Sequence, residues 1–448
     1  MFHKTKRDIL NGNILQQMLL FFFPVFLGYL LQQIYGVVDS IVLGRFVGKE
    51  GLAAVGGSAT SIINVILNLV SGMSAAITVI TAQNHGKGDA EKVSDSVRTG
   101  MFIAIVLGAL ITVVMAVLSP LLLKIMSVPE EIVRPSLIYM YLYFLSIVPY
   151  FIYQAGVSIL RALGDSKSTV GFILLTAVVK IAADLILAGL LHLGVLGTSL
   201  ATFLAHLTCA IVILTMFRLT PDAYHYSLKD FSCDRETLKQ TVRIGIPFAI
   251  QSMMFAIPNA VVQTKINSFG TDAIAAYSAF NTVDNFFWCY SNSVSASTLT
   301  MAGQNYGGHN ISRVRKTCYW AMLMEAVGAG VVSTIFFFFR RGIFSLFLDD
   351  PAVISLGERM LYVMVFSYVL FVLIEPSSAV LKAIGDAKTT MYIAIISICF
   401  LRLVYLLFFP QKTAVYPIFC YPLSWAVAGI AYQACFFFNK KLRIPQSR

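Results

Sequence analysis

Twelve stretches of apolar residues, each long enough to cross a lipid bilayer, follow one another along this chain. A membrane-spanning helix needs about 20 mostly apolar residues, because lipid offers no hydrogen-bond partner to the backbone. The stretches lie near residues 14–43, 51–83, 94–119, 132–156, 168–191, 194–217, 240–265, 272–302, 314–339, 355–381, 389–410 and 414–438. The sequence therefore predicts an all-α integral membrane protein with twelve transmembrane helices.

The composition excludes several other classes of protein. Of the 448 residues, 58% are hydrophobic and 12% are charged, whereas soluble domains carry about 25% charged residues. The seven cysteines are scattered singly without CxxC spacing, so neither a disulfide framework nor a zinc site is indicated. A soluble enzyme, a secreted scaffold and a nucleic-acid binder are therefore not expected.

Basic residues are distributed unevenly between the two sides of the predicted membrane. With a cytoplasmic N-terminus, 22 of the 33 Lys and Arg residues fall on the inner side, nine on the outer side and two within spans. Lys and Arg prefer the cytoplasmic side, so we expect both termini inside the plasma (inner) membrane. The net charge of +11 then orients the chain and contacts anionic lipid, without a nucleic-acid partner.

The second half of the chain repeats the first. The segment 160–169 (LRALGDSKST) recurs at 381–390 (LKAIGDAKTT), and Gln83-Asn84-x-Gly86 recurs as Gln304-Asn305-x-Gly307, both 221 positions later. Locally these motifs are typical of helix ends and turns. Their repetition predicts two six-helix lobes related by a pseudo-two-fold axis along the membrane normal, an arrangement of secondary transporters.

The lobes are expected at 1–217 (helices 1–6) and 240–448 (helices 7–12), with a cytoplasmic linker at 218–239.

Charged side chains lie inside the predicted spans, where each costs roughly 2.5–3.5 kcal/mol at mid-bilayer on insertion scales. They are Asp39, Lys180, Asp184, Asp284, Glu325, Glu375 and Arg402. Gln32 and Tyr35 share a helix face with Asp39, and this face is expected to line the interior of the bundle. Lys180 and Asp184 are four residues apart and can form an ion pair.

If Asp39 packs against this pair, the cluster carries a net charge of −1 and attracts either a proton or Na⁺. A static ion network that only fixes helix packing is the alternative.

In the second half, Arg402 lies opposite Lys180 in the repeat, and we expect a structural salt bridge between it and Glu375 on the preceding helix. Glu325 has no obvious partner. A polar stripe in the second span includes Asn64 and Asn68, and its repeat partner contains Asp284. Such stripes are hydrogen-bonding seams or walls of a wet cavity. We favour a cavity, lined by Gln32, Tyr35, Asn64, Asn68, Asp284 and Glu375.

The chain resembles the multidrug and toxic compound extrusion family over nearly its whole length. The resemblance rests on residues 32–39 leading into Gly44-Arg45-Phe46-Val47-Gly48, on Gly56, Gln83 and Gly86, on the paired GDxK segments, and on residues 194–202. It implies two lobes forming a V around a central cavity, and export of cationic or amphipathic organic compounds in exchange for H⁺ or Na⁺, without another cofactor. We expect a monomer.

By the same resemblance, Asp39 and Asp184 match the acids of the family's N-lobe cation site, and Thr202 matches a hydroxyl contributor. Lys180 stands where Asn is usual, and its ammonium competes with Na⁺ for the carboxylates, so we favour protons. Phe255 stands where another branch carries an acid in helix 7, so a cation site of that type is not expected in the C-lobe.

Three alternatives remain at this point. A sister transporter that flips a lipid-linked glycan has similar twin lobes, and a strongly cationic cavity would favour it. A membrane enzyme is disfavoured because no HExxH, GxSxG or histidine cluster is present. A channel is disfavoured because the repeat supplies two halves and no ring of subunits.

Overall fold

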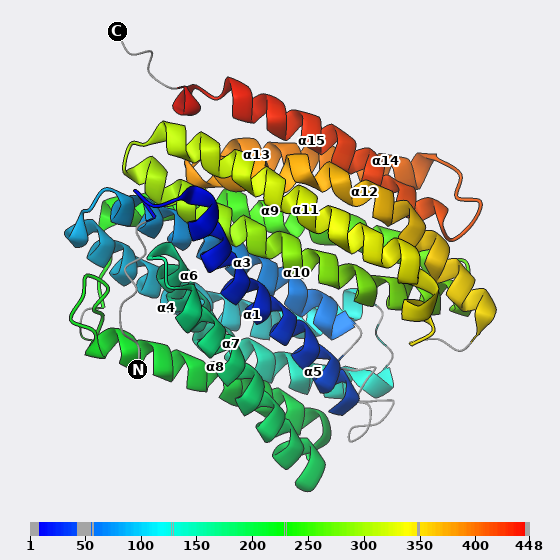
Figure 1. The fold of residues 1–448 in the computed structure, drawn as a ribbon. Helices are drawn as coiled ribbons and strands as arrows, with labels where there is room; N and C mark the ends of the chain where they lie inside the picture. Colours follow the sequence, from blue (N-terminus) through cyan, green and yellow to red (C-terminus); the bar gives the residue numbers. More distant parts are fainter. Residues whose placement is uncertain are drawn as a thin grey trace. The chain divides into compact units, whose positions relative to one another are not determined.

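A computed structural model describes residues 9–42, 55, 58–126, 128, 130–227, 229, 231–346 and 350–443, with the side chains of 35–42, 58 and 131 left out. Figure 1 shows a chain built of helices, and no strand occurs in the described residues. Helices satisfy their own backbone hydrogen bonds, which is what lipid demands of a spanning segment. The predicted all-α class is confirmed.

Most of the predicted spans correspond to single long helices. Ten segments of the described chain are long and apolar enough to cross a membrane, and a pair bent by 43° makes up to eleven. The helices of the first half are α1 (Ile14–Val42), α3 (Ser58–Gly86), α4 (Ala90–Ile125), the bent pair α5 (Glu130–Leu145) and α6 (Ile147–Ala162), α7 (Ser166–Asp184) with η2 (Leu185–Leu190), and α8 (Gly194–Leu219).

The second half begins with α9 (Arg235–Asn267) and α10 (Thr271–Gly307), followed by α11 (Ile311–Phe344) and α12 (Pro351–Ala383). The next span consists of α13 (Ala387–Ile393), η4 (Ala394–Phe400) and α14 (Leu401–Phe408). The last span consists of η5 (Tyr416–Phe419) and α15 (Cys420–Phe438), and the short helix η6 (Lys440–Leu442) follows it. The 37-residue α10 covers the eighth predicted span. It is not among the ten segments that are apolar enough to cross a membrane by composition alone.

The chain divides into two compact units. The first contains residues 27–245, and the described part of the second contains 9–26 and 246–443. Two helices thus contribute to both units: α1, whose first half belongs to the second unit, and α9, whose first residues belong to the first.

The first half of α1 is held in the second unit by apolar packing and by one arginine. Met18 and Phe22 are buried in a cluster with Val294 of α10 and Met324 of α11. The guanidinium of Arg313 donates to the carbonyls of Ile9 and Gly12, at 3.0 and 2.8 Å. Arg313 therefore fixes the segment that leads into α1.

The repeated GDxK segment forms the same turn in both halves. Gly164 and Gly385 have φ angles of +90° and +74°, a conformation that glycine adopts without steric cost. Asp165 then caps α7 by accepting the backbone N–H of Ser168 at 3.0 Å. Asp386 at the start of α13 instead accepts the Thr389 hydroxyl at 2.7 Å. The turns predicted at these helix ends are confirmed.

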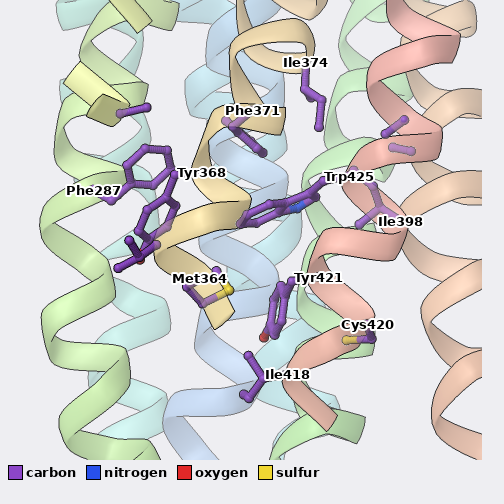
Figure 2. Close-up of a cluster of buried hydrophobic side chains, with 14 of the residues drawn as sticks. Phe287, Met364, Tyr368, Phe371, Ile374, Ile398, Ile418, Cys420, Tyr421 and Trp425 are labelled. Atoms are coloured by element: carbon purple, nitrogen blue, oxygen red, sulfur yellow. The ribbon is translucent and has the colours of Figure 1, made fainter. Parts of the chain in front are cut away.

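A group of aromatic side chains packs within the core of the second unit, as Figure 2 shows for α10, α12 and α15. Phe287 stacks on Tyr368 with ring centroids 4.0 Å apart, and Trp425 packs edge-on against Phe371 at 5.2 Å. Each aromatic pair of this kind stabilises the fold by about 0.5–1.5 kcal/mol beyond the contribution of its buried surface area. They fix the rotamers around Asp284, discussed below.

Gly197 lets α8 approach the backbone of η2 closely. A Cβ atom at this position would lie 2.9 Å from the carbonyl carbon and oxygen of Leu187, and backbone cannot move away as a side chain can. We expect Gly197→Ala to destabilise the protein by about 1–3 kcal/mol. Thermal unfolding in detergent measures this change.

The matched control is Gly171→Ala in α7, where an added Cβ meets no atom within 4 Å. It should leave the melting temperature unchanged or raise it, because Ala favours the helix. Equal destabilisation by both substitutions would contradict the packing described for Gly197.

Candidate cation-coupling site

The candidate site is built around an ion pair buried in α7. Lys180 and Asp184 lie about one helical turn apart, and the ammonium of Lys180 donates to Oδ2 of Asp184. The side chains are only 2% and 1% exposed. Because an isolated charge is costly in an apolar interior, each residue stabilises the charged form of the other. The pairing predicted from the spacing is confirmed.

The helix geometry changes directly after the pair. α7 ends at Asp184, and residues Leu185–Leu190 form a π-helical turn. Turns of this type are frequent at functional sites. The second half also contains a π-helical segment, Ala394–Phe400, but it precedes Arg402 instead of following a charge. The repeat is therefore not exact at its charged residues.

Further buried side chains with polar groups come from α7, α8 and the start of α6. Oγ1 of Thr176 lies 2.9 Å from Sγ of Cys209. His206 is buried, interacts electrostatically with Lys180, and has its Nδ1 atom 3.2 Å from the Ser146 hydroxyl. The ring of Tyr150 lies 4.9 Å from the imidazole. His206 thus connects the surroundings of Lys180 to further buried polar side chains.

Two residues expected to complete the site fall outside what the structure describes at the side-chain level. Tyr35 and Asp39 lie on α1, but their side chains belong to the range left out. The approach of Asp39 to Asp184 therefore stays a prediction. Gln32 is exposed within its unit, and Thr202 is buried on α8 with its hydroxyl donating to the Thr198 carbonyl at 3.1 Å. The motif segment 44–48 and Gly56 also lie outside the described residues.

The polar stripe of α3 has two parts. Asn64 is exposed and Asn68 is half-buried, and their place in a cavity wall stays a prediction. Further along the helix, Thr78 is buried and its hydroxyl lies 3.4 Å from the carbonyl of Ser158 on α6, within hydrogen-bond range. The stripe therefore combines an accessible surface with a seam between helices.

Asp284 lies in the aromatic core of the second unit. Its carboxylate accepts the Tyr368 hydroxyl at 2.6 Å and the Trp288 indole N–H at 2.7 Å. It is half-buried, and both oxygens have a donor. Asp284 is therefore held in a fixed orientation by its own unit.

The predicted salt bridge between Arg402 and Glu375 is wrong. In the described part of the second unit, the Arg402 guanidinium donates to the Ser424 hydroxyl at 2.8 Å and to Oδ1 of Asn259 at 3.3 Å, and stacks over the Tyr421 ring. Cation–π contact and neutral acceptors replace the expected carboxylate. Glu375 is half-buried on α12, directly before Pro376.

Sequence reasoning missed His206, Cys209 and Asn259. His206 carried an available signal, because an imidazole within an apolar span is as exceptional as a carboxylate. Cys209 and Asn259 carried none, since their partners lie on other helices and depend on tertiary packing. Among the described side chains, no group of three or more His, Cys, Asp and Glu residues is placed to hold a metal ion.

The sequence matches the MatE family over residues 24–186 and 244–407. "Probable multidrug resistance protein YoeA" of Bacillus subtilis (strain 168) is 24% identical over 393 residues, covering 86% of this chain and 85% of that protein. "Probable multidrug resistance protein YpnP" of the same organism is 26% identical over 401 residues, covering 88% of each.

Among solved structures, "Crystal structure of MATE in complex with MaL6" superposes with a TM-score of 0.90 at 20% identity, covering 97% of this chain and 98% of that one. A MOP superfamily transporter from Pyrococcus furiosus gives a TM-score of 0.89 at 20% identity and covers 98% of both chains. These two likenesses concern the fold.

The energetic role of the ion pair can be tested by a double-mutant cycle. Lys180→Met leaves the Asp184 carboxylate without its ammonium, and Asp184→Asn leaves the ammonium without its carboxylate. Each single change should cost about 3–5 kcal/mol, and the double change much less, because it leaves neither charge behind. Thermal unfolding followed by labelling of buried thiols, such as Cys209, measures the three variants. Additive losses would contradict a direct pair.

Proposed function

This chain belongs to the MatE family, the multidrug and toxic compound extrusion transporters, and is therefore a transporter, not an enzyme; from this premise we propose that it exports cationic or amphipathic organic compounds across the cell membrane in exchange for protons. The names of the Bacillus subtilis relatives support a multidrug substrate range. Family membership favours this function over the flipping of lipid-linked glycans.

The observation that carries the choice of coupling ion is the Lys180–Asp184 pair. An ammonium hydrogen-bonded to the Asp184 carboxylate competes with Na⁺ for the same oxygen ligands. A proton needs only one free carboxylate oxygen or imidazole nitrogen, and no coordination shell. The buried pair therefore supports proton coupling over Na⁺ coupling.

We assign the coupling proton to Asp39, with Lys180 and Asp184 as the fixed charges that position it and Thr202 as a nearby hydroxyl. When Asp39 is ionised, the cluster carries an excess negative charge that favours an organic cation or a proton, but not both. Binding of one then promotes release of the other, as antiport by alternating access requires. Gln32, Tyr35, Asn64 and Asn68 are proposed to line the substrate path, with both termini cytoplasmic.

Asp39→Asn should abolish proton-driven efflux while leaving the fold intact, because Asn is of similar size but cannot exchange a proton. The measurement is ethidium transport in proteoliposomes with an imposed pH gradient. Efflux should fall to the rate of protein-free vesicles.

The matched control is Asp272→Asn, which neutralises an exposed acid in the first turn of α10 and should retain efflux. Gradient-driven efflux by Asp39→Asn at the unmutated rate would refute the assignment.

Lys180→Asn should shift the ion preference toward Na⁺, since it removes the competing ammonium and adds an amide oxygen. Lys180→Met is the comparison, because it removes the charge without adding a ligand. We expect Na⁺-stimulated efflux only for the Asn variant. The same stimulation in both variants, or in neither, would show that Lys180 does not set the ion preference as described.

A further inference from the structure

The second unit contains a buried carboxyl group that the proposed coupling site does not use. Glu325 lies in the middle of α11 and is 0% exposed. Neither of its oxygens has a hydrogen-bond partner in the part of the chain that the structure describes. It differs in this from Asp284, which accepts two hydrogen bonds, and from Asp184, which is paired with Lys180.

The groups facing Glu325 come from the neighbouring helices of its own unit. On α10, the Ser291 side chain faces Glu325, and its hydroxyl oxygen has no partner that meets the distance and angle of a hydrogen bond. On α12, Glu375 is the ionisable group that interacts with Glu325 electrostatically. No cation is among these groups. The first half of α1, residues 14–26, which packs in the same unit, carries no ionisable side chain.

Tyr290 of α10 packs beside the segment of α11 that carries Glu325. Its hydroxyl donates to the carbonyl of Met324 at 2.5 Å, and its ring stacks edge-on with Phe22 at 5.1 Å. The ring fits because position 328 is glycine, where a Cβ atom would lie 2.0 Å from it. Glu325 is therefore enclosed by an aromatic ring and apolar side chains, without water-accessible surface.

A carboxylate in such surroundings is very costly, because it has neither solvent nor a cation, one serine hydroxyl is its only candidate donor among these groups, and a second carboxylate opposes it. The neutral acid costs far less, and its hydroxyl needs only one acceptor, for which the Ser291 oxygen is a candidate. A metal ion is a poor fit, since hard cations take several oxygen ligands and one carboxyl with one hydroxyl supplies too few.

We propose that Glu325 is a proton-binding site of the second unit, separate from Asp39 and Asp184, and that it exchanges this proton during transport. The acid is protonated in the enclosed state described here. When water reaches it, the O–H bond breaks, the proton passes to water and the carboxylate remains, to be protonated again from the other side. That Glu325 is protonated is one claim, and that it exchanges its proton during transport is a second claim, which rests on the proposed antiport.

The protonation of Glu325 can be tested without a transport assay, by infrared spectroscopy of the purified full-length protein at pH 7. An exposed glutamate is ionised at this pH. The unmutated protein should show the C=O band of a protonated carboxyl, and Glu325→Gln should lose it. Glu358→Gln is the matched control: this glutamate of α12 has Arg340 as an ion-pair partner 3.9 Å away and should not contribute to the band. Identical spectra of the unmutated protein and Glu325→Gln would overturn the proposal.

The exchange of this proton during transport is tested by the ratio of ethidium concentrations on the two sides of a proteoliposome membrane that a pH gradient sustains. Loss of one exchanged proton per cycle should lower this ratio roughly tenfold for each pH unit of gradient. Glu325→Gln, which imitates the neutral acid, should show this loss, and Glu358→Gln should not. If Glu325→Gln does not fold, Glu325→Met replaces it as the apolar variant of similar length.

An unchanged ratio in a folded Glu325 variant would overturn the exchange, even if the infrared band is lost. Failure of the unmutated protein to transport ethidium against its gradient would refute the proposed function instead, and the infrared result would still decide whether Glu325 holds a proton.

Discussion

Lipid offers no hydrogen-bond partner and no counter-charge, and the buried polar groups of this protein are organised by that constraint. Lys180 and Asp184 satisfy it by pairing within one helix. Arg402 satisfies it with neutral acceptors and an aromatic ring, and Asp284 with two aromatic donors. A side chain that does not satisfy it with protein partners must carry a proton or bind an ion, and this is the physical basis of the coupling that we propose.

The two halves of the chain share their turns but differ in their charges. Both GDxK segments place a glycine with positive φ before a helix. The charged residues that follow are not equivalent, because the first half has an ammonium paired with a carboxylate, whereas the second has a guanidinium among neutral groups. The repeat therefore supplies a common frame, and the two halves differ in the charged residues placed on it.

Features set by local periodicity were predictable from the sequence. The spans, the repeat and the Lys180–Asp184 pair depend only on hydropathy and on spacing along one helix. The partners of Arg402 were not predictable, since Asn259 lies 143 positions away and Ser424 on another helix. The assignment of residues 9–26 to the second unit also depends on tertiary packing, through Arg313 and the methionines around α1. Local hydropathy carries no information on which neighbour a helix will choose.

The most direct measurement compares ion gradients on the unmutated protein, reconstituted with ethidium as the transported cation. A proton gradient imposed alone should drive ethidium against its own gradient, and a Na⁺ gradient at equal pH should not. Ethidium movement that follows the Na⁺ gradient, or that responds to neither ion, would contradict the view that a proton, held by a buried carboxyl group, powers this transporter.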